Sequence, residues 1–216
     1  MVSNFQIERK RRSEAILLKE DVPFIDHLPV VESEEDIQLR SLEQVAWRAM
    51  ALNVVAARAE GLGRARFLSI VEQYDLKSAF TPDEQQFVFD DEPSEHARIQ
   101  FVWRYEAYWT LLWALSYIDE LGRPAHNCNV ELAVQLLVDR SPAQFIKEST
   151  LRTANEILDA TDLIYRYHWA CVDARLNGRT APAGLDEGVV MERHHALNWL
   201  TGYMDNEDWD DVSTDT

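Results

Sequence analysis

The chain has 216 residues and a strongly acidic composition, with 38 Asp and Glu against 21 Lys and Arg and a formal net charge of −17. This balance argues against nucleic acid and anionic membrane surfaces as partners, because phosphate binding needs a basic surface. It favours electrostatic attraction to a basic protein. With 46% hydrophobic residues there is ample material for a packed core, so we expect a single helical domain over residues 1–216.

Features that report on cellular compartment predict a cytoplasmic protein. The apolar run within residues 1–21 spans four residues, which is too short for the core of a signal peptide. No stretch approaches the ~18 uninterrupted apolar residues that a membrane span requires. Cys128 and Cys171 are the only cysteines and their spacing matches no metal site, so we expect reduced thiols.

The first half of the chain predicts several helices of moderate length. Ser41 and Gln44 form a capping-box pattern before an Ala-rich segment, and Thr81 and Glu84 repeat this pattern with a proline between them. Residues 22–31 hold two prolines and are predicted to be an extended connection. The predicted helices cover residues 1–21, 41–60, 64–76 and 81–90.

Two longer segments, residues 94–121 and 150–177, are predicted to form the centre of the molecule. Both are apolar over most of their circumference at about 100° per residue, which is typical of helices buried among other helices. A last helix is predicted to start at Asp186. The acidic tail over residues 205–216 contains Trp209, whose large apolar surface argues that the tail docks onto the domain.

These patterns predict an all-α fold, an irregular bundle of about seven to eight helices around the two buried central helices. Residues 1–21 form the N-terminal helix of this single domain, and residues 205–216 form its docked acidic tail. The sequence contains no alternating strand pattern, internal repeat or low-complexity tract that would favour another fold class.

Two charged residues fall on helical surfaces that are otherwise apolar. Glu106 lies among aromatic and aliphatic side chains, where an unpaired carboxylate costs several kcal/mol or stays protonated. Arg193 lies within the apolar arc of the last helix, and a guanidinium cannot shed its charge. Because each residue would compensate the buried charge of the other, we predict that Glu106 and Arg193 form an ion pair.

The central segment 150–177 carries further polar residues. Asp162 and Arg166 have the favourable i,i+4 order of an ion pair, and we interpret them as a solvated rim of the helix. His168 lies on an apolar face, in register with one polar residue seven positions before it and another seven positions after it. A hydrogen-bonded structural network and a functional site remain open as interpretations of this row.

Motifs for metal binding and catalysis are weak. Glu192-x-x-His195 matches half of the pattern used by di-metal helical bundles, but no second copy of it exists. His194, on the flank of the apolar arc, is better placed to line a site. The sequence also lacks nucleophile motifs and a phosphate-binding glycine loop. We therefore expect no metal and no cofactor.

Several strings spread over the chain resemble a known family. They are Arg40-Ser41 with Ala46-Trp47-Arg48-Ala49, Trp113-Ala114-Leu115, Asp162 to Ala170, Glu192-Arg193-His194 with Ala196 to Leu200, and Trp209 to Thr216. Together they resemble the bacterial family named domain of unknown function 4272, over nearly the whole chain and most specifically in its last third. The resemblance implies a bacterial, single-domain helical protein, and it carries no activity.

The sequence leads us to expect a cytoplasmic binding or regulatory protein without catalysis of its own. Its ligand-binding site would be lined by six side chains: Glu106, Asp162, Arg166, His168, Arg193 and His194. A basic protein is the expected partner, for instance a toxin that the acidic chain neutralises. The alternative is a small hydrolase, assisted by a metal or using His168 with a carboxylate as general base. A third interpretation gives all six residues a structural role.

Overall fold

The computed structural model describes residues 2–205 and 208–216. Residue 1 and residues 206–207, which belong to the predicted N-terminal helix and acidic tail, lie outside the described residues. The α-helices are α1 (Asn4–Lys19), α2 (Leu42–Glu60), α3 (Arg64–Tyr74), α4 (Pro82–Phe89), α5 (Glu95–Val102), α6 (Arg104–Ala114), α7 (Val130–Val138), α8 (Pro142–Glu148), α9 (Ala154–Leu176) and α10 (Glu187–Thr201). Two 3-10 turns, η1 (Pro182–Gly184) and η2 (Tyr203–Asp205), complete the described secondary structure, so the all-α prediction is confirmed.

Helix starts follow the capping chemistry of the sequence. The Ser41 side chain accepts a hydrogen bond from the Gln44 backbone N–H, and the Gln44 side chain accepts one from the Ser41 backbone N–H. Thr81 and Glu84 form the same pair of hydrogen bonds at the start of α4. Each such cap stabilises its helix by about 1 kcal/mol, because it satisfies backbone N–H groups that have no partner inside the helix. The sequence pattern therefore located these two helix starts correctly.

The long helix predicted over residues 94–121 is instead two helices and a turn. α5 ends at Val102 and α6 begins at Arg104, with Trp103 at the junction. The Trp103 ring packs so closely against Gly188 of α10 that a Cβ on that glycine would lie 2.7 Å from it. After α6, the backbone amide of Arg152 donates to the Ala114 carbonyl at 2.9 Å. A segment distant in sequence therefore satisfies a carbonyl at the C-terminal end of the helix.

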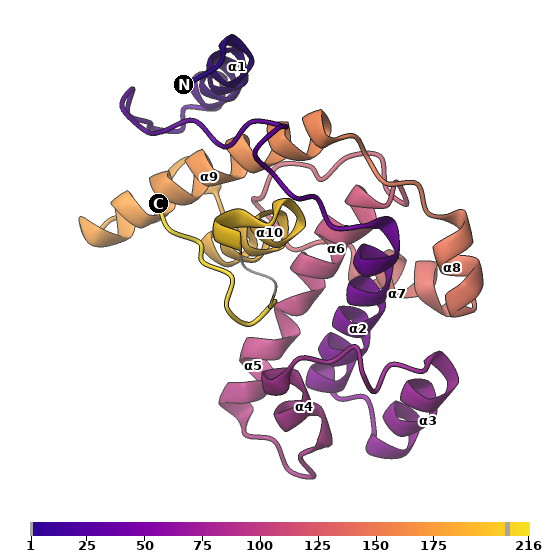
Figure 1. Cartoon of the computed structure of the whole chain (residues 1–216). Helices are drawn as coiled ribbons and strands as arrows, with labels where there is room; N and C mark the ends of the chain where they lie inside the picture. Colours follow the sequence, from indigo (N-terminus) through magenta and orange to yellow (C-terminus); the bar gives the residue numbers. More distant parts are fainter. Residues whose placement is uncertain (1, 206–207) are drawn as a thin grey trace.

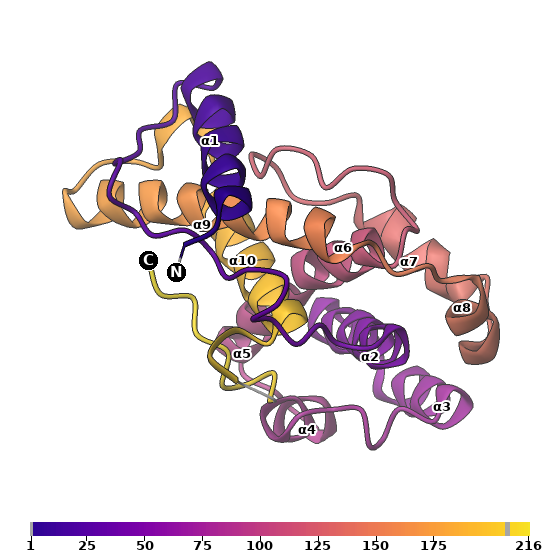
Figure 2. The ribbon, with the colours of Figure 1, turned by 45° about the horizontal axis from the view of Figure 1, so that its top comes forward.

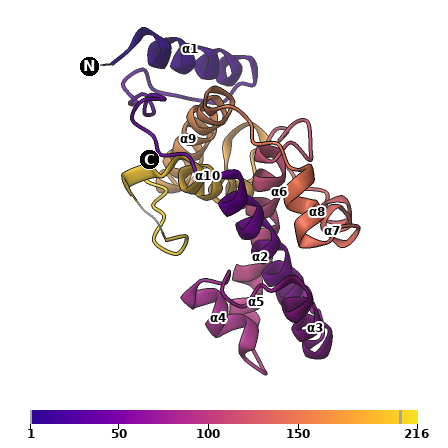
Figure 3. The same cartoon turned by 45° about the vertical axis from the view of Figure 1, so that its right-hand side comes forward.

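The helices pack as a core with smaller helices around it (Figure 1). α2 packs along α6 and α5, and α10 packs between α9 and α6. α1 lies along α9 on the outside of the bundle, at the opposite end from α3 and α4 (Figure 3). Alanines occupy much of the buried surface of α2 and let α6 approach closely, so α2 is a third central helix beside α6 and α9.

The chain between α1 and α2, residues 20–41, crosses α9 on its way to the core (Figure 2). We call this segment the α1–α2 connection. The tail over residues 208–216 lies along α10 (Figures 1 and 2). Among the described residues, no helix combines the length and the apolar character needed to cross a membrane.

Trp209 anchors the tail. Its side chain is 2% exposed and lies between aromatic and cationic groups. The ring makes an edge contact with Trp199 at a centroid distance of 5.4 Å, and the guanidinium of Arg48 lies 5.2 Å from its centroid. The backbone carbonyl of Trp209 is 3.0 Å from Nε2 of His195. One aromatic side chain and its own carbonyl thus hold the tail against α10 and α2.

We predict that Trp209→Ala lowers the free energy of unfolding by about 3–5 kcal/mol, because it removes a fully buried aromatic side chain and leaves a cavity. Urea denaturation followed by circular dichroism would measure the loss. Trp47→Ala, at a half-buried position of α2, is the control and should cost less. A loss below about 1 kcal/mol for Trp209→Ala would contradict the anchoring role.

Candidate functional site

Glu106 and Arg193 form the buried ion pair that the sequence predicts. Nη2 and Nε of Arg193 lie 3.2 and 3.3 Å from Oε2 of Glu106. The remaining Arg193 nitrogen donates to the carbonyls of Leu121 and Gly122 at 3.0 Å each. The second carboxylate oxygen accepts from the backbone N–H of Cys128. Since both charged groups find their partners inside the protein, this pair ties α6, α10 and the loop after α6 together.

The solvated-rim interpretation of Asp162 and Arg166 is wrong. Both side chains are 0% exposed and form a two-pronged ion pair, with distances of 2.8 and 2.7 Å between the guanidinium nitrogens and the two carboxylate oxygens. Arg166 also donates to the carbonyl of Pro29 at 3.1 Å. The α1–α2 connection and α1 cover this face of α9, where Arg9 of α1 binds Asp159 at 2.9 Å. The polar stripe is therefore an interface between helices.

Sequence reasoning missed two further ion pairs, one buried and one partly buried. Nη2 of Arg48 contacts both oxygens of Glu84 at 2.7 and 2.6 Å, and the same carboxylate also caps α4 through Thr81. Arg104 contacts Glu192 at 3.0 Å. Burial raises the pKa of Glu192, while the positive charge of Arg104 opposes that rise. An arginine within the Ala-rich α2 was the available signal for the first pair.

His168 and His194 form a buried pair of imidazoles. Their Nδ1 atoms are 2.8 Å apart and their rings meet edge to face, with centroids 5.1 Å apart. Burial lowers the pKa of His168 to about 4, with a smaller contribution from Arg175. Burial and the neighbouring imidazoles lower the pKa of His194 to about 3. At neutral pH both rings are therefore uncharged, and one donates its Nδ1 proton to the other.

The side chains of Glu192 and His195 do not point to a shared site. Glu192 turns to Arg104, whereas Nε2 of His195 contacts the carbonyl of Trp209. Burial lowers the pKa of His195 to about 4, and the charge of Arg104 adds to this effect. Within residues 2–205 and 208–216, no three His, Cys, Asp or Glu side chains gather closely enough to hold a metal ion.

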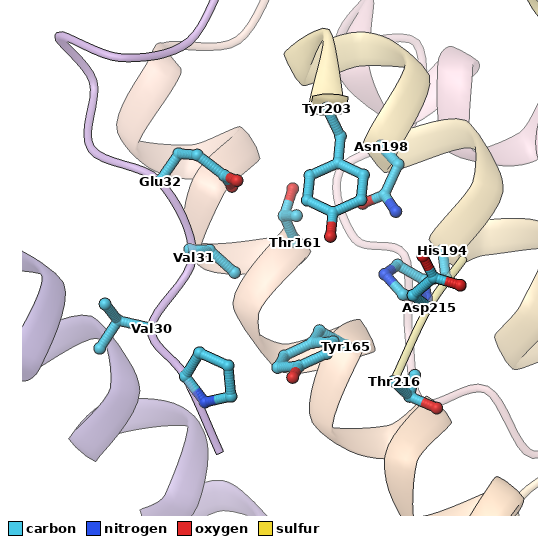
Figure 4. A pocket seen from close by; sticks show the side chains of 11 residues that line it. Val30, Val31, Glu32, Thr161, Tyr165, His194, Asn198, Tyr203, Asp215 and Thr216 are labelled. Carbon is cyan, nitrogen blue, oxygen red and sulfur yellow. The ribbon is translucent and has the colours of Figure 1, made fainter. Parts of the chain in front are cut away.

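A cavity of about 260 Å³ lies where the α1–α2 connection, α9, α10, η2 and the tail meet. Figure 4 shows the side chains that surround it, with Val30, Val31 and Glu32 on one side and Asp215 and Thr216 on the other. Its full lining is Pro29, Val30, Val31, Glu32, Thr161, Tyr165, His194, Asn198, Tyr203, Asp215 and Thr216. Of the six residues expected to share a site, His194 alone lines this pocket.

The lining of this pocket is negative and rich in hydrogen-bond acceptors. Glu32 and Asp215 have no ion-pair partner among the described residues, and the lining contains no Lys or Arg. Burial raises the pKa of Tyr203, and the charges of Glu32 and Asp215 raise it further. Asn198 donates its amide N–H to a tail carbonyl at 2.8 Å, and its amide oxygen accepts from no group in the described part of the chain. Tyr165 adds a second aromatic ring to the wall.

Sequence reasoning did not find the pocket because its wall comes from five separate segments. In the sequence, Tyr165 falls on the apolar face of segment 150–177 and Tyr203 on the apolar arc of the last predicted helix, so neither is marked as a site residue. Glu32 and Asp215 occur within acidic runs, where nothing marks one carboxylate as different from its neighbours. Only the packing of the connection and the tail against α9 and α10 brings these residues together.

We predict that Arg193→Met lowers the free energy of unfolding by about 3–5 kcal/mol, because it strands the Glu106 carboxylate in the core. The melting temperature, measured by calorimetry, should fall by at least about 6 °C. The double variant Arg193→Met/Glu106→Gln should regain part of this loss, since the glutamine oxygen can still accept from Cys128. An unchanged melting temperature for Arg193→Met would show that the pair is not held for stability.

Acidification is predicted to destabilise the protein through the histidine pair. In the unfolded chain both imidazoles titrate near pH 6.5, but in the folded protein their pKa values are about 4 and about 3. Between these values the unfolded chain binds more protons, so the free energy of unfolding falls as the pH drops below 6.5. The loss should reach roughly 2 kcal/mol per histidine at pH 5.

Denaturation of the parent protein and of the double variant His168→Leu/His194→Phe at pH 7.5 and 5.0 would measure this contribution. The variant removes both imidazoles, so its stability should change less over this interval. An equal loss in both proteins would assign the acid sensitivity to other groups.

Comparison with known proteins gives a family without an activity. The family model described as Domain of unknown function (DUF4272) matches residues 9–212, which is nearly the whole chain. No curated protein and no solved structure matches the sequence. The resemblance noted in the sequence is therefore confirmed by the family model, whereas the comparisons leave the ligand and any reaction open. The chain belongs to the DUF4272 family of domains of unknown function.

Proposed function

We propose that this protein is a binding or regulatory protein of the bacterial cytoplasm, and that its pocket receives a lysine or arginine side chain from a basic protein partner. The observation that carries the proposal is the pair of unpaired carboxylates, Glu32 and Asp215, in a pocket whose lining has no positive charge. The two cysteines are free thiols, which fits a reducing compartment.

The chemistry of the pocket suits a cationic group. Carboxylates attract the positive charge, and the rings of Tyr165 and Tyr203 offer faces against which a cation packs favourably. At about 260 Å³ the cavity lies just below the usual ~300–1,000 Å³ range of ligand sites. This size fits one side chain or a similarly small ligand. An extended peptide would need a longer groove.

The overall charge supports a basic protein as the source of that side chain. A net charge of −17 attracts a positively charged partner over distances up to about 8 Å at physiological ionic strength. Such attraction raises the association rate more than it raises the affinity. The pocket would then supply the specific contact after the encounter, so binding should weaken as salt increases.

The hydrolase alternative finds less support in the geometry. A histidine acting as general base is normally oriented by a carboxylate, but the contact of His168 is the imidazole of His194. The carboxylates of Asp162 and Glu106 are each engaged by an arginine. The residues that this reaction would need are therefore committed to other partners.

We predict that a short capped peptide with one central lysine shifts the NMR signals of Tyr165 and Tyr203, and that the same peptide with norleucine does not. Glu32→Gln should weaken lysine-peptide binding several-fold, because it removes one of the two carboxylates. Glu34→Gln is the matched control, since Glu34 lies two residues away and outside the pocket lining. Equal affinity of both variants, or binding of the norleucine peptide, would argue against the proposal.

A further inference from the structure

His194 is a pocket residue whose hydrogen-bonding role depends on a second imidazole, His168, which is not part of the lining. Its side chain is 2% exposed, and its Nδ1 contacts Nδ1 of His168 at 2.8 Å. Its other ring nitrogen, Nε2, has no partner among the described residues. Figure 4 places the imidazole on the side of the pocket that faces Tyr165 and Tyr203. An unpaired ring nitrogen on a nearly buried imidazole that lines a cavity points to a ligand.

Two neutral imidazoles joined through their Nδ1 atoms can place their protons in two ways. If His168 donates, His194 carries its own proton on Nε2 and offers the pocket an N–H donor. If His194 donates, its Nε2 keeps a lone pair and offers the pocket an acceptor. The ligand determines which arrangement is favoured, because the two differ only in where two protons reside.

The other polar groups of the pocket favour the acceptor arrangement once a cation is bound. The Thr161 hydroxyl donates to the carbonyl of Ile157 at 2.8 Å, so it offers only lone pairs to the cavity. The Asn198 amide oxygen and the Glu32 and Asp215 carboxylates are acceptors as well. A ligand with several N–H groups and a positive charge satisfies this set, whereas the two carboxylates would repel an anion.

We propose that His194 is a specificity-determining residue of this pocket. With a cation bound, it donates its Nδ1 proton to His168 and accepts an N–H from the ligand through Nε2. This inference rests on the proposed function and goes beyond it, because it assigns the chemical class of the ligand. Primary ammonium and guanidinium groups are selected, and quaternary ammonium groups of equal charge are rejected because they have no N–H to donate.

The charge state of the pair fits this role. Burial keeps both imidazoles neutral at pH 7, and the charge of Arg175 near His168 and the imidazole of His195 near His194 act in the same direction. A protonated pair would repel a cation and would present no lone pair. The tyrosine hydroxyls of the pocket have raised pKa values and also stay neutral. Glu32 and Asp215 therefore supply the charge of the lining, and His194 supplies a neutral acceptor.

The test compares n-butylammonium with n-butyltrimethylammonium, which share a charge and a chain but differ in N–H groups. NMR titration of the full chain at pH 7.5 should give an affinity on the order of tenfold or more in favour of n-butylammonium. The double variant His168→Leu/His194→Phe should bind both cations alike, since it removes the acceptor without leaving an unpaired imidazole. His126→Asn, an exposed change outside the pocket, is the control and should keep the preference.

A second measurement needs no variant. Nitrogen-15 shifts of the histidine rings should show His194 with its proton on Nδ1 when n-butylammonium is bound. Equal affinity for the two cations, a preference that survives in the double variant, or a bound His194 protonated on Nε2 would each overturn the inference while leaving cation binding intact. If neither cation binds and the lysine peptide also fails to bind, the proposed function falls together with the inference.

Discussion

A buried arginine cannot lose its proton, and this constraint shapes the half of the molecule that contains the pocket. Arg166 is fully buried on α9, and Asp162 alone does not satisfy its guanidinium. Its additional contact is the Pro29 carbonyl, which fixes the α1–α2 connection across α9. α1 precedes the connection and adds the Arg9 to Asp159 contact. The pocket wall over residues 29–32 is therefore held by this guanidinium at Pro29, and by the Gln6 amide of α1, which donates to the Val31 carbonyl at 2.8 Å.

Charged residues in this protein divide into two groups with different physical roles. Inside the bundle, arginines meet carboxylates that come from other helices or other turns, as Arg193 meets Glu106 and Arg48 meets Glu84. Replacing such pairs by apolar residues is often neutral or stabilising, but removing one partner is costly, so they fix the arrangement of the helices more than they raise its stability. The carboxylates at the pocket have no such partner, and an unpaired charge at a cavity is free to meet a ligand.

The sequence predicted features that depend on neighbours along the chain and failed where distant segments decide. Capping boxes are local, so the starts of α2 and α4 were predicted correctly, whereas α9 begins at Ala154 and not at residue 150. The predicted 94–121 helix is interrupted at Trp103, which packs on α10. The pairing of Glu106 with Arg193 could be predicted because burying either charge without a partner is energetically costly. Asp162 and Arg166 were misjudged because an i,i+4 pair has the same pattern on a rim as at an interface. The pocket itself has no local signature.

The tail connects the stability of the fold to the composition of the pocket. Trp209 holds the segment against α10, and Asn198 donates to the carbonyl of Ser213 four residues further on. The same segment then supplies Asp215 to the pocket lining. A ligand that contacts Asp215 binds only when the tail is docked, so by mass action it must also stabilise the docked tail. Binding of the proposed ligand would consequently be linked to the packing of Trp209, although different side chains carry the two.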